Sequence, residues 1–175
     1  TKDVNIGEQL KYVQNATGAV LSPFDSWLLI RSLETLKIRV EKHSENAIKI
    51  AEFLTKLPGI KKVHFPGLPT HKNYEVAKKQ QKYPGSIISI SFENDTEETA
   101  IKFVTSTKIF KLAESLGGAK SLLSHPATMT HKSIPREKRI SSGITDSLVR
   151  LSVGLEDAED LIADIKQAIE KCLTK

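Results

Sequence analysis

Cysteine and aromatic residues are both scarce in this chain. Its single cysteine, Cys172, leaves no partner for an internal disulfide and excludes a cysteine-rich metal site. A reducing compartment such as the cytoplasm fits that usage. Aromatic residues make up only 6% of the chain, so few rings are available to stack on bases between the lysines. Nucleic-acid binding is therefore a poor interpretation of the basic charge.

Long hydrophobic runs are also missing. No apolar stretch reaches the length that a membrane-spanning helix needs. The first residues, Thr1-Lys2-Asp3, do not resemble a secretory signal peptide. We therefore expect a cytoplasmic protein without a membrane partner.

The remaining composition is that of an ordinary globular protein. Hydrophobic residues make up 39% and charged residues 27% of 175 residues, enough for one domain with a real core and an appended arm. The net charge of +5 comes from lysines spread along helical faces, which indicates a solvated surface.

Helical patterns dominate the first third of the sequence. A short helix is expected at 7–15, with Gly18 where a C-terminal stop belongs. Ser22-Pro23 has the sequence of a helix start, with serine as the cap and proline in the first turn. Apolar residues then recur at helical spacing until Leu57-Pro58-Gly59, which predicts one long helix, bent or straight.

The rest of the chain mixes strands and helices. Strands are expected at 63–65, 86–92, 110–113 and 148–153. Further helices are expected at 70–82, from Asp95 onward and after Asp157. About four strands and four or five helices, without strict alternation, predict an α+β fold with a small, mostly antiparallel sheet covered by helices.

Arg150 is the most informative single residue. Alternation places Val149, Leu151 and Val153 on one face of the strand and Arg150 on the other. An arginine in this position is either a solvated side chain on an open face or a fixed guanidinium that binds a planar anion such as a carboxylate. Spacing alone leaves both interpretations open.

Residues 114–118 form the second informative segment. Glu114-Ser115 is followed by Gly117-Gly118, where backbone amides can approach a ligand without a Cβ in the way. An ordinary turn would have the same composition, so the glycine pair by itself does not distinguish a ligand-binding loop from an ordinary turn.

Several blocks together resemble the pyridoxal-phosphate enzymes of transsulfuration, the cystathionine gamma-synthase, gamma-lyase and beta-lyase family of Cys/Met metabolism. The similarity covers essentially the whole chain in the right order. The residues that carry it lie in these segments: 14–20, 22–28, 33–36 with Arg39, 113–118, 124–131, 143–146 and 148–157.

The resemblance implies a domain organisation. Residues 1–56 would form an N-terminal segment and a long helix linking to a pyridoxal-phosphate domain absent from this chain, and residues 57–175 would form the C-terminal, substrate-side α+β domain of an aminotransferase-like fold. The lysine that forms the Schiff base would lie before Thr1. Thr105-Ser106-Thr107-Lys108 looks superficially like the family's lysine motif, but it stands where the family has no cofactor lysine.

The same resemblance assigns the substrate-binding residues. Arg150 would bind the substrate α-carboxylate with help from Ser115, Glu114 would lie near the distal end of the substrate, and Thr130 would lie near the same pocket. No catalytic or cofactor-binding residue is expected in this chain. His125 and His131 flank Met129, but no cysteine or acidic partner stands at ligand spacing, so no metal site is expected.

The expected function is therefore the C-terminal part of an enzyme that forms or cleaves C–S bonds of sulfur amino acids, inactive in isolation. Its partners would be an amino-acid substrate (cystathionine, cysteine or a homoserine ester), the N-terminal pyridoxal-phosphate domain and further copies in a tetramer. The alternatives are the corresponding half of a beta-lyase, a stand-alone amino-acid-binding domain, or an interaction domain in which Arg150 is solvated.

Overall fold

The computed structural model describes residues 1–173, and they divide into two compact units, 1–37 and the residues from Ile38 onward. The first unit contains α1 (Val4–Thr17) and α2 (Pro23–Leu33), neither of which has a buried residue. The predicted stop and start are both confirmed. Gly18 ends α1 with φ 65°, and Ser22 caps α2 by accepting a hydrogen bond from the Asp25 N–H at 3.1 Å.

The predicted long helix is interrupted. It is divided into α2 and α3 (Leu36–Leu54) by a turn at Glu34 and Thr35. The Ser32 hydroxyl donates to the Leu28 carbonyl at 2.8 Å, and the Thr35 hydroxyl donates to the Ser32 carbonyl at 3.5 Å. Such bonds compete with the helical ladder and bend a helix, which accounts for the break without a glycine or proline.

The second unit is an α+β arrangement with a five-stranded mixed sheet. Its strands are β1 (Ile60–His64), β2 (Ile87–Phe92), β3 (Lys111–Leu112), β4 (Leu122–Ser124) and β5 (Val149–Ser152). They lie in the order β1-β2-β5-β4-β3. Three pairings are antiparallel, and β3 pairs with β4 in parallel.

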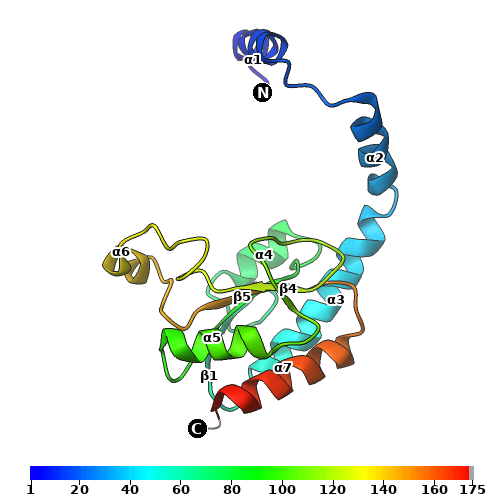
Figure 1. The fold of residues 1–175 in the computed structure, drawn as a ribbon. Helices are drawn as coiled ribbons and strands as arrows, with labels where there is room; N and C mark the ends of the chain where they lie inside the picture. Colours follow the sequence, from blue (N-terminus) through cyan, green and yellow to red (C-terminus); the bar gives the residue numbers. More distant parts are fainter. Residues whose placement is uncertain (174–175) are drawn as a thin grey trace. The chain divides into compact units, whose positions relative to one another are not determined.

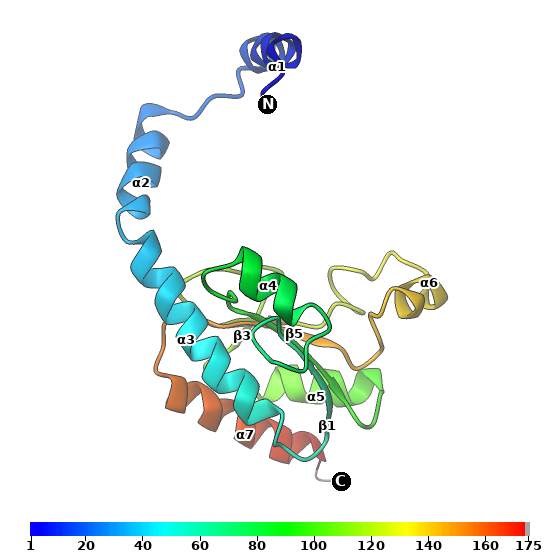
Figure 2. The same cartoon turned by 180° about the vertical axis from the view of Figure 1, so that it is seen from behind.

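Four further helices complete this unit in the described part of the chain. They are α4 (Tyr74–Gln80), α5 (Glu97–Ser106), α6 (Arg136–Ser141) and α7 (Ala158–Leu173). Figures 1 and 2 show α5 and α7 on one side of the sheet and α4 on the other. The expected helix at 70–82 is shorter than predicted because residues 70–73 form turns. Strand β4 and helix α6 were not predicted.

The core lies between the sheet and helices α3, α5 and α7. Strands β2, β4 and β5 contribute Ile88, Ile90, Leu123, Val149 and Leu151, each at most 1% exposed. They pack against apolar residues of the three helices, which are Ala47, Ile50, Ala51, Leu54, Ala100, Phe103, Val104, Leu161, Ile165, Ala168 and Ile169. The opposite face of the sheet therefore remains available for polar residues.

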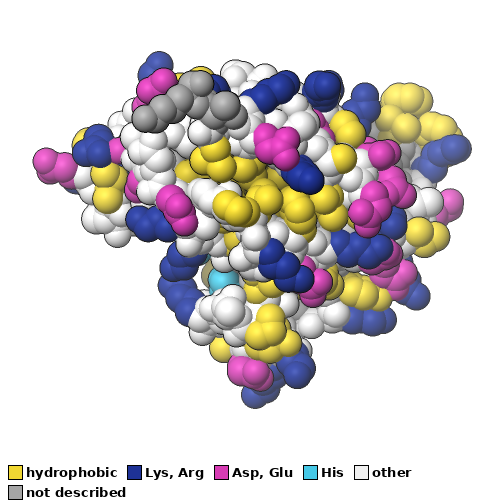
Figure 3. Space-filling model, turned by 90° about the horizontal axis from the view of Figure 1, so that it is seen from below, with side chains coloured by type: hydrophobic (Ala, Val, Ile, Leu, Met, Phe, Trp, Pro, Cys, Tyr) yellow, Lys and Arg dark blue, Asp and Glu magenta, His cyan; other side chains and the backbone are white. Residues whose placement is uncertain are grey.

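The surface carries both signs of charge. In Figure 3, lysine and arginine side chains alternate with acidic ones around hydrophobic side chains near the middle of the face shown. No helix among the described residues is long and apolar enough to cross a membrane.

Candidate functional site

Arg150 lies on the face of the sheet opposite the core. Its strand neighbours Val149 and Leu151 are fully buried, whereas Arg150 is half-buried, which confirms the predicted alternation. The register places Arg150 between Ser89 of β2 and Ser124 of β4. Directly opposed residues on neighbouring strands point to the same side of a sheet. A guanidinium flanked by two serines thus occupies the middle of this face.

The predicted loop lies beside this guanidinium. Arg150 donates a hydrogen bond from Nη2 to the Ser115 carbonyl oxygen at 3.4 Å. The Gly117 N–H donates to the Ser152 Oγ at 2.8 Å, two residues further along β5. Gly117 has a φ of 75°, a conformation that glycine adopts without strain. The structure therefore brings Arg150 and the segment 114–118 together.

The C-terminal end of the segment that joins β3 to β4 is also fixed by hydrogen bonds. We call residues 113–121, which join β3 to β4, the glycine loop. The Glu156 carboxylate accepts from both the N–H and the hydroxyl of Ser121, each at 2.8 Å. The Gly154 N–H donates to the Ser121 Oγ at 2.8 Å, and the Leu155 N–H donates to the Ala119 carbonyl at 2.8 Å. The end of β5 and the residues after it thus fix the loop beside Arg150.

Glu114 and Ser115 are placed where a ligand could reach them. Both residues are exposed, and neither side chain makes a hydrogen bond within residues 1–173. Ser115 contacts Arg150 through its backbone carbonyl, so its hydroxyl is free to bind another group. An exposed carboxylate and an exposed hydroxyl therefore stand at the edge of the Arg150 site.

Thr130 is not drawn into this arrangement. It is exposed, and its Oγ1 lies 2.7 Å from the Nδ1 of the adjacent His131. In the described residues no hydrogen bond joins Thr130 to Arg150 or to the glycine loop. The structure gives it a local partner only.

Ser124 is a residue that the sequence analysis missed. It lies opposite Arg150 in register and is fully buried, and its Oγ has no hydrogen-bond partner within the described residues. An unsatisfied buried hydroxyl costs about 1–3 kcal/mol, so such a group needs an explanation. The signal was the alternation of Leu123 and Ser124, but a strand of three residues is too short to recognise from its pattern.

His125 has a structural role. It is 1% exposed, and its Nδ1 lies 2.8 Å from the Thr128 Oγ1 while its Nε2 lies 2.8 Å from the Asp146 carbonyl. Both ring nitrogens are therefore engaged within the chain. No group of three or more His, Cys, Asp or Glu side chains in the described part could hold a metal ion.

An ion-pair cluster beside His125 was also missed. Asp146 binds the exposed Arg136 and the buried Arg139, the latter with an Nη2–Oδ1 distance of 2.6 Å. Arg139 also donates from Nη1 to the carbonyls of Ile144 and Thr145 at 2.9 and 3.2 Å. The hydrogen bond from Arg136 and then that from Arg139 lower the pKa of Asp146. The cluster holds the segment that leads into β5.

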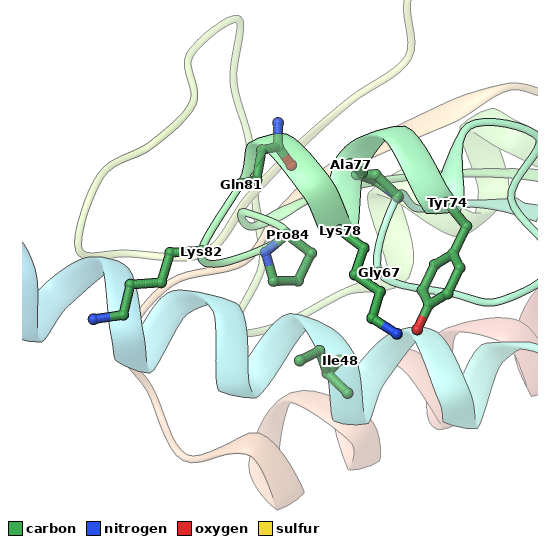
Figure 4. A pocket seen from close by; sticks show the side chains of 9 residues that line it. Ile48, Gly67, Tyr74, Ala77, Lys78, Gln81, Lys82 and Pro84 are labelled. Atoms are coloured by element: carbon green, nitrogen blue, oxygen red, sulfur yellow. The ribbon is translucent and has the colours of Figure 1, made fainter.

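The burial of the described lysines bears on where a covalently held cofactor could be bound. No lysine among residues 1–173 is buried. Lys78 and Lys82 line a pocket of about 250 Å³ between α3 and α4 (Figure 4). Both are exposed; Lys82 points away from the pocket, and the Lys78 Nζ lies 5.9 Å from the centre of the Tyr74 ring. Lys108, from the motif set aside above, is exposed as well, and its backbone N–H is bound by Asp164 at 2.7 Å.

The sequence matches a known protein family along nearly its whole length. The family model described as "Cys/Met metabolism PLP-dependent enzyme" matches residues 1–170. A cystathionine beta-lyase of Coxiella burnetii is 50% identical over 164 residues, which cover 94% of this chain and 42% of that protein. A cystathionine gamma-lyase of Bacillus subtilis is 50% identical over 170 residues, which cover 97% of this chain and 44% of the relative.

Solved structures give the same result. Yeast cystathionine gamma-lyase superimposes with a TM-score of 0.93 at 48% identity, covering 99% of this chain and 45% of the other. The cystathionine gamma synthase of Xanthomonas oryzae, in complex with aminoacrylate and cysteine, has a TM-score of 0.90 at 42% identity. The match covers 98% of this chain and 44% of the synthase. This chain spans less than half the length of the relatives it matches.

Proposed function

Because the chain belongs to the Cys/Met metabolism family of PLP-dependent enzymes, we propose that it is the C-terminal part of an enzyme that forms or cleaves C–S bonds of sulfur amino acids. Its substrate would be cystathionine, cysteine or a homoserine ester. The chain's own share of the work is to bind the amino-acid backbone of that substrate. The observation that carries this proposal is the hydrogen bond between Arg150 and Ser115 at 3.4 Å, which sets a guanidinium beside the glycine loop.

Arg150 binds the α-carboxylate of the substrate in this proposal. A guanidinium has five N–H donors in a planar fork, and only one is used in the bond to the Ser115 carbonyl. Enough donors remain for a carboxylate to be held at both oxygens. The hydroxyl of Ser115 is exposed next to the fork and supplies a further donor. A fixed carboxylate restricts rotation about the substrate Cα bonds, which orients the bond to be broken.

Glu114 contributes at the other end of the substrate. Its exposed carboxylate attracts a distal ammonium group such as that of cystathionine. Relatives named beta-lyase and gamma-lyase are equally identical to this chain, at 50%. The assignment to a gamma-type enzyme rather than a beta-lyase therefore rests on Glu114. Thr130 would lie near the same pocket with a minor role, since its hydroxyl pairs with His131 and makes no hydrogen bond to Arg150 or the glycine loop among the described residues.

Pyridoxal phosphate is the cofactor of the whole enzyme in this proposal, and when bound it supplies an electron sink for the reaction at the substrate Cα. The lysine that holds it would lie in the N-terminal domain, and no lysine among residues 1–173 is buried. Residues 1–56 would then link to the N-terminal domain that holds the cofactor, and 57–175 would form the substrate-side domain of an aminotransferase-like fold. A cytoplasmic tetramer completes the proposal, and the chain by itself would be inactive.

The test is substitution of Arg150 in the intact enzyme. Arg150→Ala removes a charge-assisted pair with the substrate and should lower kcat/KM. The expected loss of transition-state stabilisation is about 2–5 kcal/mol. Arg150→Lys should also impair it, because a point charge does not reproduce the fork. Lys166→Ala, on the exposed side of α7, serves as the control and should leave kcat/KM unchanged.

Unchanged kcat/KM in Arg150→Ala would refute the carboxylate assignment. The stand-alone alternatives are tested separately, by mass spectrometry of the purified protein and an absorbance scan of the internal-aldimine band. A longer, yellow protein supports the enzyme, whereas a colourless 19.4 kDa protein that does not take up pyridoxal phosphate supports a binding or interaction domain.

A further inference from the structure

A second pocket lies beside strand β1, apart from the Arg150 site. Its volume is about 180 Å³, and it is lined by Lys62, Val63, His64, Thr70, His71 and Lys72. A water molecule occupies about 30 Å³ in the liquid, so this space has room for a small polyatomic ion. We call it the basic pocket. Arg150 does not line it. Ser89 of β2 pairs with His64 on one side and with Arg150 on the other, so His64 and Arg150 lie on the same face of the sheet with β2 between their strands.

Every ionisable residue in the basic pocket is a base. Two lysines and two histidines line it, and no acidic residue does. Neither Lys62 nor Lys72 makes an ion pair within the described residues, whereas Lys42 and Lys49 on α3 both pair with Glu45. Like charges gathered without a counter-charge repel one another, and a bound anion would relieve that repulsion.

Both burial and neighbouring positive charges act on His64 in this pocket. Burial first, and then the charges of Lys62, His71 and Lys72, lower its pKa below the ordinary value. These surroundings therefore disfavour the charged form of the His64 imidazole. A bound anion would act in the opposite direction and raise the pKa of His64.

The pocket also offers donors suited to oxygen atoms. The Nδ1 of His71 accepts a hydrogen bond from the Asn73 N–H at 3.3 Å, so a neutral His71 ring carries its proton on Nε2 and can donate from there. The Thr70 hydroxyl makes no hydrogen bond within residues 1–173, and each lysine has three N–H donors. Hydroxyl, imidazole and ammonium donors around one cavity match an oxyanion.

We propose that the basic pocket is a binding site for phosphate, either as the free ion or as a phosphate monoester. The lysines supply the charge, and Thr70, His64 and His71 supply directed hydrogen bonds. Arg150 is not among the residues that line this pocket, so either assignment can fail without the other.

Calorimetric titration of the 175-residue chain with inorganic phosphate, at constant ionic strength in chloride, tests the proposal. Saturable binding is expected, and the His64 ring proton signal in NMR should titrate at higher pH when phosphate is present. Lys62→Gln with Lys72→Gln should weaken phosphate binding about tenfold or more, the scale of one lost charge-assisted contact. Glycerol 3-phosphate, as a second titrant, distinguishes the two sources: tighter binding than phosphate indicates a monoester, and equal or weaker binding indicates the free ion.

Three variants control this experiment. Lys79→Gln with Lys166→Gln removes the same charge at exposed positions that do not line the pocket, and it should bind phosphate like the wild type. Arg150→Ala should also bind phosphate normally. Thr70→Val tests the pocket without changing its charge and should weaken binding. The proposal is overturned if phosphate heats do not saturate, or if the two double variants lose affinity equally.

Discussion

At the scale of single residues, Asp146 is a group whose charge contributes to stability. It joins Arg136 on the surface to Arg139 beneath it, and the side chain of Arg139 is only 6% exposed. A buried guanidinium without its carboxylate is costly, because breaking such a pair leaves an uncompensated charge. Asp146 is therefore needed in its ionised form.

Asp146→Asn should destabilise the protein at pH 7 by about 1–3 kcal/mol, the cost of removing the charged acceptor from a buried donor. The wild type should also lose stability in acid. Arg136 and Arg139 lower the pKa of Asp146 in the folded state, so its contribution is complete above the unfolded value of about 3.9 and disappears as the pH falls through the lower folded value. Urea unfolding at a series of pH values measures both effects.

Arg136→Gln is the matched control for this prediction. Arg136 is exposed, with 68% of its side chain accessible, and solvent screens its pair with Asp146. Its loss should change stability much less than Asp146→Asn. Equal unfolding free energies for the wild type and Asp146→Asn at pH 7 would show that the carboxylate does not stabilise the fold.

The residue scale also shows what the sequence could predict. The position of Arg150 on the face opposite the core follows from strict alternation in Leu148-Val149-Arg150-Leu151, and the structure confirms it. Ser124 and Arg139 could not be found in this way. Ser124 belongs to a strand of three residues, and Arg139 is buried by contacts with residues 144–146 that only the folded turn creates.

At the scale of elements, the glycine loop depends on close approach to the end of β5. A Cβ on Gly154 would lie 2.5 Å from both the Ala119 carbonyl oxygen and the Ser121 backbone nitrogen, and it would also meet the Glu156 carboxylate. Gly154→Ala should therefore push the loop away and cost about 1–3 kcal/mol of folding stability, the range for overpacking. Thermal unfolding measures the loss.

Gly118→Ala is the control within the same loop. A Cβ there meets nothing within 4 Å, and Gly118 is not among the glycines with positive φ. This variant should unfold like the wild type. If Gly154→Ala were equally stable, the loop would be less tightly held than its hydrogen bonds with residues 152–156 indicate.

Local chemistry explains which elements were predictable. Gly18 and Ser22 mark helix ends through hydrogen bonds within a few residues of themselves, so the sequence contains the whole cause. Strand β4 is different, because Leu122–Ser124 becomes a strand by pairing with β5 and β3. Helix α6 has only six residues, and an apolar face cannot be recognised in so short a segment.

At the scale of the whole molecule, residues 1–37 contribute no core. Neither of their helices has a buried residue, and Trp27 is 53% exposed. The buried core cluster lies within residues 47–169. Deletion of residues 1–37 should therefore leave the unfolding temperature of the remaining unit within a few degrees of that of the whole chain. Circular dichroism melts of both forms test this.

Deletion of a second terminal segment is the control for the effect of shortening the chain. Removal of residues 158–175 takes away α7, with Leu161, Ile165, Ala168 and Ile169 of the core, and should abolish cooperative unfolding. A large drop in melting temperature after deletion of residues 1–37 would mean that this segment stabilises the remainder through contacts beyond those described.

The parallel pairing of β3 with β4 has a practical consequence for redesign. The two strands are adjacent in the sheet, run in the same direction and are joined only by the glycine loop. Hydrogen bonds from Lys111 to Ser121 and from Ala113 to Leu123 clamp both ends of that connection. Exchange of this loop between relatives should keep both of these hydrogen bonds, which favours segments of equal length. Under the proposed function, side-chain libraries at positions 114–116 would be the way to alter substrate specificity without changing the length of this loop.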